Sequence, residues 1–269
     1  MVKATKVPLK RSKNDKRYYL LIIKHQGLLR VLDMGFSWKT IWSGKAADGL
    51  SNASLADLIR LNGFDLQNGG FTESQFAELA CAYASALNIK PQHKVVEVGC
   101  GSGAFIKCIQ AKINADFYGV DYSPSLINIA KKAMPSSVFS VAEANKDPFP
   151  EKKFDVVMFH SVFQYFPSMK YAEEVLKLWA AKVERGGCLG IFDLNNAELE
   201  NEYHSRRMRF YNSEREYWEM YRDAEHLFFR IDVLRNLLSG LGLRDIDFFE
   251  SFGAENKNSG LRFGVIAKR

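Results

Sequence analysis

The sequence contains no apolar run of about 18 residues, the length that a helix needs to cross a membrane. Its formal net charge of +6 over 269 residues is too mild to require nucleic acid as a partner. Near the basic N-terminus the only apolar run is Leu20–Ile23, which is too short for the core of a signal peptide. The sequence shows neither an internal repeat nor a low-complexity tract. We therefore expect a globular, cytoplasmic protein without a membrane span.

Cysteine is scarce, and its spacing excludes two kinds of site. Cys81, Cys100, Cys108 and Cys188 form no C-x-x-C pair, and no histidine follows them at metal-ligand spacing. This pattern disfavours a zinc or other metal site and a disulfide framework, so we expect reduced thiols. Cys100 also lacks a neighbouring histidine that would activate it, and we expect it to be a small core residue.

The composition that is present is that of an ordinary α/β protein, with 47% hydrophobic and 25% charged residues. Strands are expected at 94–98, 116–120, 138–141, 154–159, 188–193, 245–251 and 261–267, with helices at 72–87, 104–109, 123–134, 169–183 and 227–239. The expected helix ends are a capping box at Thr72 and Gln75, an N-cap and first-turn proline at Ser123 and Pro124, and a stop at Gly186–Gly187. This alternation predicts a doubly wound, mostly parallel, seven-stranded sheet with helices on both faces, a Rossmann-like fold. Because only residues 252–260 join the last two strands, the C-terminal strand is expected to be antiparallel.

Outside this alternating pattern, the chain divides into less regular regions. Residues 1–17 carry seven Lys or Arg and one Asp, and residues 18–70 mix aromatic, glycine and polar residues without a clear period. We expect 1–70 to be a basic tail and a lid over the substrate, and 71–269 to be the main domain. An aromatic- and arginine-rich insertion at about 195–225 is expected to form a helical cap over the site.

Three glycines follow the first strand of the main domain, in VVEVGCGSGAF (95–105). In parallel sheets ligands bind at the carboxyl ends of the strands. Glycine permits positive φ and close approach of a ligand to the backbone, and the following helix N-terminus favours an anionic group. The spacing Gly99-x-Gly101-x-x-Ala104 also fits the dinucleotide pattern, and a tight turn without a ligand would need glycine too. The loop alone therefore does not identify its ligand.

Two later blocks accompany the glycine loop. They are YGVDYSPSLINIAKK (118–132), in which Asp121 follows Gly103 by 18 residues, and VAEANKDPFPEKKFDVVMFHSVFQYF (141–166). In this order the three blocks resemble the class I S-adenosylmethionine (SAM) dependent methyltransferases, in particular the small-molecule branch of types 11 and 25. An NAD oxidoreductase has no reason to carry the third block. The resemblance covers about residues 70–193 and implies the methyltransferase fold, SAM as cofactor and S-adenosylhomocysteine (SAH) as product.

The resemblance also implies roles for residues at the ends of the strands. The residues expected to bind the cofactor are Glu97, Gly99, Gly101, Gly103, Asp121, Tyr122, Glu143, Ala144 and His160. Asp121 would hold the ribose hydroxyls, and Glu143 would accept from the adenine amino group beside the Ala144 N–H. The family usually has Asp where Glu143 stands and an apolar residue where Asp147 stands, so this segment departs from the pattern.

Residues for the methyl acceptor are expected from three regions. His160 and Tyr165, after the fourth strand, are the candidate catalytic residues, although a histidine at a strand end also serves as a structural hydrogen-bonding group. The N-terminal region contributes Tyr18, Tyr19, Trp38 and Trp42. The expected substrate-binding residues are Gln164, Tyr165, Arg206, Arg209 and Tyr211. The arginines could clamp a phosphate or carboxylate, or form a solvated helix face.

The leading interpretation is a methyltransferase that acts on an O or N atom of a small molecule, of natural-product or sugar-precursor type. An RNA or protein methyltransferase is the alternative, supported by the basic tail but lacking the N/D-P-P-Y type of motif after the fourth strand. A non-catalytic SAM-binding partner protein is a further alternative, which the intact glycine loop and Asp121 disfavour. The expected partner is thus a small-molecule acceptor, without nucleic acid. The N-terminal region could serve a homodimer as well as a lid.

Overall fold

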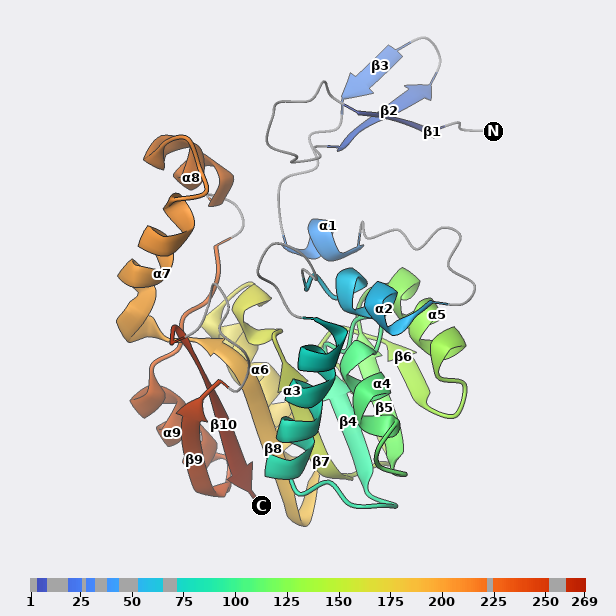
Figure 1. Ribbon diagram of the computed structural model, residues 1–269, viewed down its shortest axis with the longest axis vertical. Coiled ribbons are helices and arrows are strands. Elements are labelled where there is room, and N and C mark those ends of the chain that lie inside the picture. Colours follow the sequence, from blue (N-terminus) through green and yellow to red (C-terminus); the bar gives the residue numbers. More distant parts are fainter. Residues whose placement is uncertain are drawn as a thin grey trace.

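A seven-stranded sheet forms the centre of the computed structural model, which describes residues 4–8, 19–25, 28–31, 38–43, 53–64, 72–221, 225–251 and 260–269 (Figure 1). The strands lie in the order β6-β5-β4-β7-β8-β10-β9. Their bounds are β4 (Lys94–Val98), β5 (Asp116–Asp121), β6 (Val138–Val141), β7 (Phe154–His160), β8 (Val183–Asn195), β9 (Arg244–Glu250) and β10 (Arg262–Lys268). The seven-stranded sheet is therefore confirmed.

The C-terminal strand runs against the direction of the others. The pairs β4·β5, β4·β7, β5·β6 and β7·β8 are parallel, whereas β10 is antiparallel to both β8 and β9. The short connection between β9 and β10 requires this reversal, as the sequence predicts. Parallel β4, β5, β6 and β7 consequently present their carboxyl ends at one edge of the sheet.

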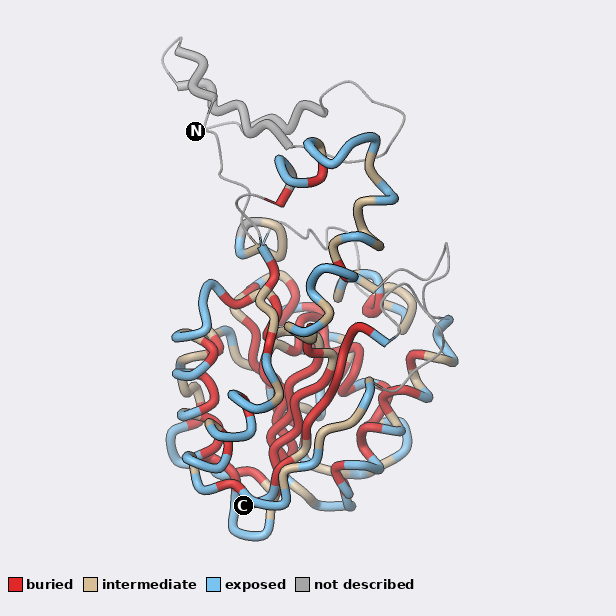
Figure 2. The backbone as a smooth tube through the Cα atoms, turned by 90° about the vertical axis from the view of Figure 1, so that its left-hand side faces the viewer, coloured by how far each residue is buried: buried red, intermediate tan, exposed pale blue. Residues whose placement is uncertain are grey.

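Helices cover both faces of the sheet, and the strands alternate to meet them. One face packs against α3 (Glu73–Ala86), α4 (Ala104–Gln110) and α5 (Pro124–Ala133), and the other against α6 (Met169–Ala180) and α9 (Ile231–Gly240). In β4, Val95 contacts the first group and Val96 the second, because successive side chains of a strand point to opposite faces. Figure 2 shows the buried strands between more exposed helices.

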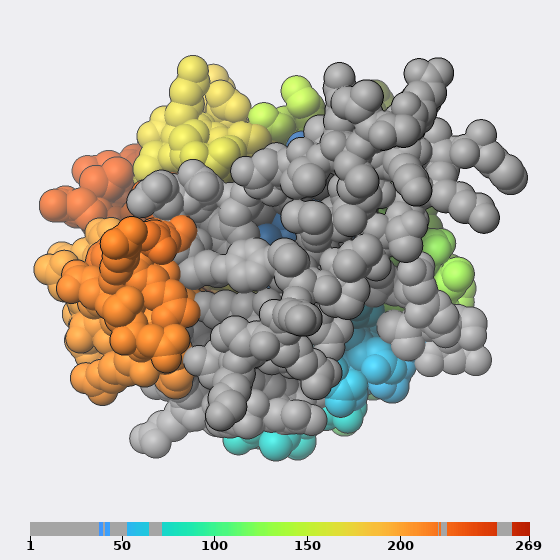
Figure 3. All heavy atoms as spheres, turned by 90° about the horizontal axis from the view of Figure 1, so that it is seen from above, coloured from blue at the N-terminus to red at the C-terminus, as the bar shows by residue number. Residues whose placement is uncertain are grey.

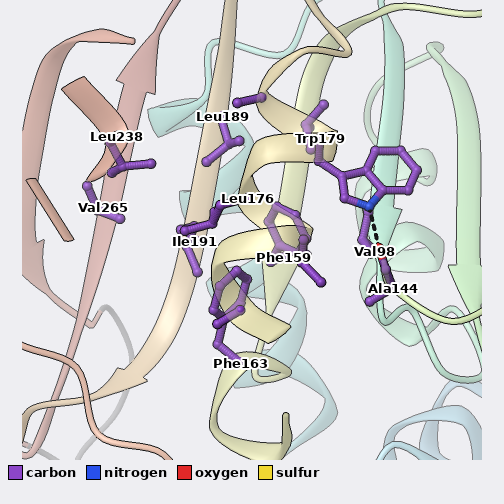
Figure 4. Packing of buried hydrophobic residues seen from close by; sticks show 14 of the residues in the cluster. Val98, Ala144, Phe159, Phe163, Leu176, Trp179, Leu189, Ile191, Leu238 and Val265 are labelled. Carbon is purple, nitrogen blue, oxygen red and sulfur yellow. Dashed lines mark hydrogen bonds between the residues drawn. The ribbon is translucent and has the colours of Figure 1, made fainter. Parts of the chain in front are cut away.

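The face beneath α6 contains the larger aromatic core. Trp179 is fully buried there with Phe159, Phe163 and Leu176 (Figure 4). The indole Nε1 of Trp179 donates to the carbonyl of Ala144 at 2.7 Å. This bond ties the middle of the core to the segment that follows β6, which is where the third sequence block begins.

Helix ends follow the predicted chemistry in part. Thr72 and Gln75 form the expected capping box of α3, each side chain accepting from the other residue's backbone N–H. Pro124 begins α5 as expected, but the hydroxyl of its N-cap Ser123 contacts Ser125 Oγ instead of capping the helix.

Two helix boundaries differ from the predicted ones. Helix α6 ends at Ala180 instead of residue 183, because Val183 already pairs with Phe154 as the first residue of β8. The glycines expected to end this helix lie inside β8, where Gly186 adopts a φ of +83°. Helix α9 begins at Ile231, and the preceding segment 225–230 is extended except for a bridge at Phe229.

The N-terminal region has more regular structure than its sequence indicates. β1 (Ala4–Pro8), β2 (Tyr19–His25) and β3 (Leu28–Val31) form an antiparallel sheet, so part of the basic segment expected to be disordered is a strand. The short helices α1 (Trp38–Ser43) and α2 (Leu55–Leu61) follow. Both lie above the carboxyl ends of the strands in Figure 1.

The insertion after β8 is helical. It contains a 3₁₀ turn (Ala197–Leu199), α7 (Glu200–Met208) and α8 (Glu214–Tyr221). In the view from above, the same face of the molecule carries α7 and α8 (orange) on one side and α2 (cyan) on the other (Figure 3). In the part of the chain that the structure describes, no helix is both long and apolar enough to cross a membrane.

Candidate active site

A cavity of about 800 Å³ opens at the carboxyl ends of the parallel strands. Its lining comes from the ends of β4, β5 and β7, the segments after β6 and β7, α1, the end of α2 and residues 225–227. One part of the wall carries acidic side chains and glycines, and another carries aromatic rings. The volume is that of a site for ligands of cofactor or drug size.

The glycine loop between β4 and α4 forms the floor of the acidic part. Gly99, Gly101 and Gly103 have φ of +79°, +56° and +78°, a region that favours glycine. A Cβ on Gly99 would lie 2.4 Å from Val162 Cγ2, and one on Gly103 would lie 2.4 Å from Met134 Cε. Gly99 and Gly101 line the cavity, whereas Gly103 caps α4 beneath it. Glycine is therefore required by both conformation and space.

Asn62, directly after α2, holds this loop through its side-chain amide. Its Oδ1 accepts from the Ser102 backbone N–H at 2.7 Å, and its Nδ2 donates to the Cys100 carbonyl at 3.1 Å. A Cβ on Gly101 would lie 2.4 Å from the same Oδ1. The buried Ser102 hydroxyl lies within 2.9 Å of the Leu58 carbonyl in α2. The sequence did not indicate Asn62, because no local signal links it to a loop 40 residues further on.

Two buried carboxyl groups face the cavity from neighbouring strands. Asp121 accepts from the backbone N–H of Gly101 at 2.9 Å and of Ser123 at 2.8 Å. Burial raises the pKa of Asp121, and these two bonds oppose the change. Burial, and then the nearby Asp121, raise the pKa of Glu97 well above its ordinary value. The Oε2 atom of Glu97 is buried without a hydrogen-bond partner among the described residues. A cationic ligand would stabilise the ionised form of both groups.

The segment after β6 forms the next wall. Glu143, Ala144 and Tyr122 all line the cavity. Glu143 accepts from Tyr171 at 3.4 Å and pairs with Lys39 of α1 at 2.5 Å. The carboxylate is thus held between α6 and α1 at the rim, with its side chain 38% exposed. Lys39 at this position was not predicted from the sequence.

His160 ends β7 and is enclosed by aromatic rings. Its imidazole stacks on Phe105 at 4.2 Å and on Phe64 at 5.4 Å between ring centroids. Burial lowers the pKa of His160 to about 4, so the ring is neutral and a weak base near pH 7. The next residue, Ser161, has a φ of +54°, which turns the chain into the cavity wall.

Of the two residues after β7 that were predicted to bind the acceptor, one lines the cavity and the other lies behind its wall. Tyr165 lines the cavity, and burial raises its pKa. Gln164 is buried outside the lining and donates to Ser161 Oγ at 2.9 Å. It supports the turn at Ser161, and its Oε1 has no partner among the described residues.

Four of the aromatic rings that line the cavity contact one another. Tyr165 contacts Trp38 at 4.8 Å, Trp42 at 5.4 Å and His226 at 5.3 Å between ring centroids. Trp38 donates from Nε1 to the Glu225 carbonyl at 3.0 Å, and Nδ1 of His226 lies 3.1 Å from the buried Tyr203 hydroxyl. Trp38 and Trp42 therefore line the cavity, and their contact with an acceptor stays a prediction. Tyr18 lies outside the described residues, and His226 was not anticipated.

The arginines expected to clamp the acceptor lie away from the described lining of the cavity. Arg206 pairs with Glu202 along α7, and Arg209 is exposed after the end of that helix. Tyr211 contacts Tyr217 at 5.1 Å and does not line the cavity. Arg207 is the inward arginine of α7, and its guanidinium lies over the rings of Tyr203 and Tyr221.

Asp147, which departs from the family pattern, has a structural partner. Its carboxylate pairs with Lys182 Nζ at 2.6 Å and accepts from the Phe149 backbone N–H at 2.8 Å. Lys182 also donates to the carbonyls of Phe149, Pro150 and Lys152, each within 2.9 Å. The acidic residue at this position therefore anchors the segment between β6 and β7.

Comparison with known families gives a match over the centre of the chain. Residues 96–191 match the family described as "Methyltransferase domain". The chain is 32% identical over 92 residues to phosphoethanolamine N-methyltransferase 3 of Arabidopsis thaliana, a match covering 33% of this chain and 19% of that protein. It is 28% identical over 120 residues to malonyl-[acyl-carrier protein] O-methyltransferase 1 of Ilyobacter polytropus, covering 42% and 44%. The matches thus span less than half of these relatives.

The fold also matches solved structures over most of the chain. One of them is magnesium protoporphyrin IX methyltransferase from Synechocystis PCC 6803 with bound SAH. The TM-score is 0.54 at 18% identity, and the match covers 81% of this chain and 94% of that chain. This likeness supports the sheet topology described above.

Proposed function

We propose that the chain, whose residues 96–191 match a methyltransferase domain, is a class I SAM-dependent enzyme that methylates an O or N atom of a small molecule. The observation that carries this proposal is the cavity in which the glycine loop, Glu97 and Asp121 meet an aromatic wall. Relatives of similar identity act, by their names, on an amine and on an acyl-carrier substrate. They leave the accepting atom open.

The carboxylates and glycines that line the cavity provide groups that suit the functional groups of SAM. SAM carries a sulfonium, an ammonium and a ribose diol, and when bound it supplies a methyl group that is already activated by positive sulfur. Glu97, with its unpartnered buried Oε2, suits a cationic group, and Asp121 retains lone pairs for hydroxyl donors. The positive-φ glycines let a ligand approach the backbone closely. These features support the expected cofactor roles of Glu97, Gly99, Gly101 and Asp121.

The chain's own contribution to transfer is alignment more than proton removal. The lone pair of the acceptor forms the new bond to the methyl carbon, the C–S bonding pair stays on sulfur, and any proton on the acceptor leaves to solvent. His160, with its pKa lowered to about 4, is a weak base, and Tyr165 is held protonated by burial. We propose that both residues position the acceptor, and that holding it in line provides most of the rate acceleration.

The proposal is tested by calorimetric titration of the purified chain with SAH. Asp121→Ala should lose most of the affinity, whereas Asp116→Ala, at the exposed start of the same strand, should bind like the wild type. At about a hundred times its Kd, SAH should stabilise the wild type by ~2.7 kcal/mol, which is on the order of 5–10 °C in Tm. Failure of the wild type to bind SAH or SAM would overturn the proposal.

A further inference from the structure

The wall that faces away from the glycine loop has a composition of its own. It consists of Trp38 and Trp42 from α1, Tyr165 and Phe166 after β7, and His226 from the segment before α9. Three separate parts of the chain thus deliver rings to one side of the cavity. The acidic cofactor residues come from other elements, at the ends of β4 and β5 and after β6.

Two of these rings are held in place by hydrogen bonds to groups outside the ring cluster. The Trp38 indole is fixed by the Glu225 carbonyl, and the His226 imidazole by the Tyr203 hydroxyl. Tyr165 lies at the centre of the group, inclined at 65° to Trp38 and 69° to Trp42. A rigid set of rings loses little conformational entropy when a ligand binds, which favours recognition by shape and ring contacts.

The same lining offers little to an anionic acceptor. Its charged side chains are Lys39, Glu97, Asp121, Glu143 and Glu225. The single cation among them, Lys39, is already paired with Glu143. Burial lowers the pKa of His226 well below its ordinary value, so it too is neutral near pH 7. Among the described lining residues, a phosphate or carboxylate would therefore meet no unpaired cation. Arg207 and Arg262 act electrostatically on Tyr165 and His226 but do not belong to this lining.

A positive charge on the accepting atom itself is excluded for a different reason. The reacting atom must present a lone pair, and a protonated amine has none. Its charge would also repel the sulfonium of the cofactor. The accepting group must therefore be uncharged when it reacts, and the aromatic lining suits a ligand that packs against rings.

We propose that the acceptor is an uncharged aromatic ring bearing a hydroxyl or amino group, bound against Trp38, Trp42, Tyr165 and His226. This inference rests on the proposed function, because it assigns the ring wall to the acceptor of the same reaction. The exocyclic oxygen or nitrogen lies toward Ser161 and Val162, where the aromatic and acidic parts of the cavity meet. The ring contributes binding through edge and face contacts with the wall.

The test compares probes of matched size on the protein saturated with SAH. 2-Naphthol, its saturated analogue decahydro-2-naphthol and 2-naphthyl phosphate are titrated calorimetrically. We expect 2-naphthol to bind at least about tenfold more tightly than either of the others. Tyr165→Leu should abolish the preference for the aromatic probe. Trp218→Leu, which changes an exposed ring on α8 outside the lining, should leave it intact.

The outcomes separate the two proposals. Equal binding of the saturated probe, tightest binding of the phosphate, or no binding of any probe to the SAH complex would overturn the aromatic acceptor while leaving the cofactor site intact. Loss of the preference in Trp218→Leu would likewise overturn the assignment to this wall. Failure of SAH itself to bind would instead overturn the proposed function, and the acceptor assignment with it.

Discussion

At the scale of single residues, Asn62 shows how one side-chain amide can fix a strained backbone turn. It satisfies a donor and an acceptor of the glycine loop at the same time. It also occupies the space that a Cβ on Gly101 would need. The matched methyltransferase domain begins at residue 96, so this contact is supplied from outside it.

We expect Asn62→Ala to weaken SAH binding by roughly tenfold. The substitution leaves the Ser102 N–H and the Cys100 carbonyl without their partners, at a cost on the order of 1–3 kcal/mol that falls on the loop conformation. Calorimetric titration measures the effect. Asn114→Ala, at an exposed position before β5, is the control and should bind SAH normally. Wild-type affinity in Asn62→Ala would show that the loop keeps its shape without the amide.

Glu97 should make the stability of the ligand-free protein depend on pH. Its pKa is raised in the fold, so the folded state holds the proton more tightly than the unfolded state does. The stabilisation from protonated Glu97 is therefore complete below the unfolded pKa of about 4.3 and is lost as pH rises through the folded pKa. The decline in Tm from pH 5 to pH 8 should be smaller in Glu97→Gln than in the wild type. Parallel declines in the two proteins would contradict this.

At the scale of elements, Lys182 joins the end of α6 to the loop between β6 and β7. Its ammonium is shared by the Asp147 carboxylate and three backbone carbonyls. The loop that follows Glu143 is therefore anchored at its far end. This contact fixes the position of the cavity wall relative to the hydrophobic core. Trp179 makes the second tie, through the Ala144 carbonyl.

Lys182→Met should destabilise the fold by about 3–5 kcal/mol, because it leaves a partly buried carboxylate without its cation and removes one donor from each of three carbonyls. In a chain of this size the expected fall in Tm is roughly 10 °C. Urea unfolding of Lys182→Met and of Lys177→Met, an exposed lysine in the last turn of the preceding helix α6, measures the difference. A fall of the same size in the control would assign the effect to helix α6 and not to the ion pair.

The elements themselves were largely predictable from the sequence. Strands β4 and β6 have the predicted bounds, because each is a short run rich in β-branched or aromatic residues. The end of α6 was not predicted, since the helical pattern continues past Ala180 and only pairing with β7 stops it. Strands β2 and β3 were missed because residues 18–70 carry no clear period.

At the scale of the whole molecule, the cavity combines what the sequence could and could not reveal. Gly99, Gly101 and Asp121 were identified because one local pattern brings them together at the ends of adjacent strands. His226 and Asn62 reach the same place from distant parts of the chain, and only the fold shows this. The arginines of the helical cap show the opposite case. Their clustering in the sequence suggested that they bind the acceptor, but Arg206 and Arg209 lie outside the described cavity lining.

The antiparallel strand β10 lies between β8 and β9, although it follows both in the chain. During synthesis β8 therefore leaves the ribosome well before its neighbour on that side exists. Until residues 262–268 emerge, the outer edge of β8 has unpaired N–H and C=O groups next to buried Leu189 and Ile191. Exposed edges of this kind pair readily with other chains. The nascent protein is thus most prone to aggregation late in translation, which makes slow synthesis of the last strand a risk and chaperone cover of β8 an advantage.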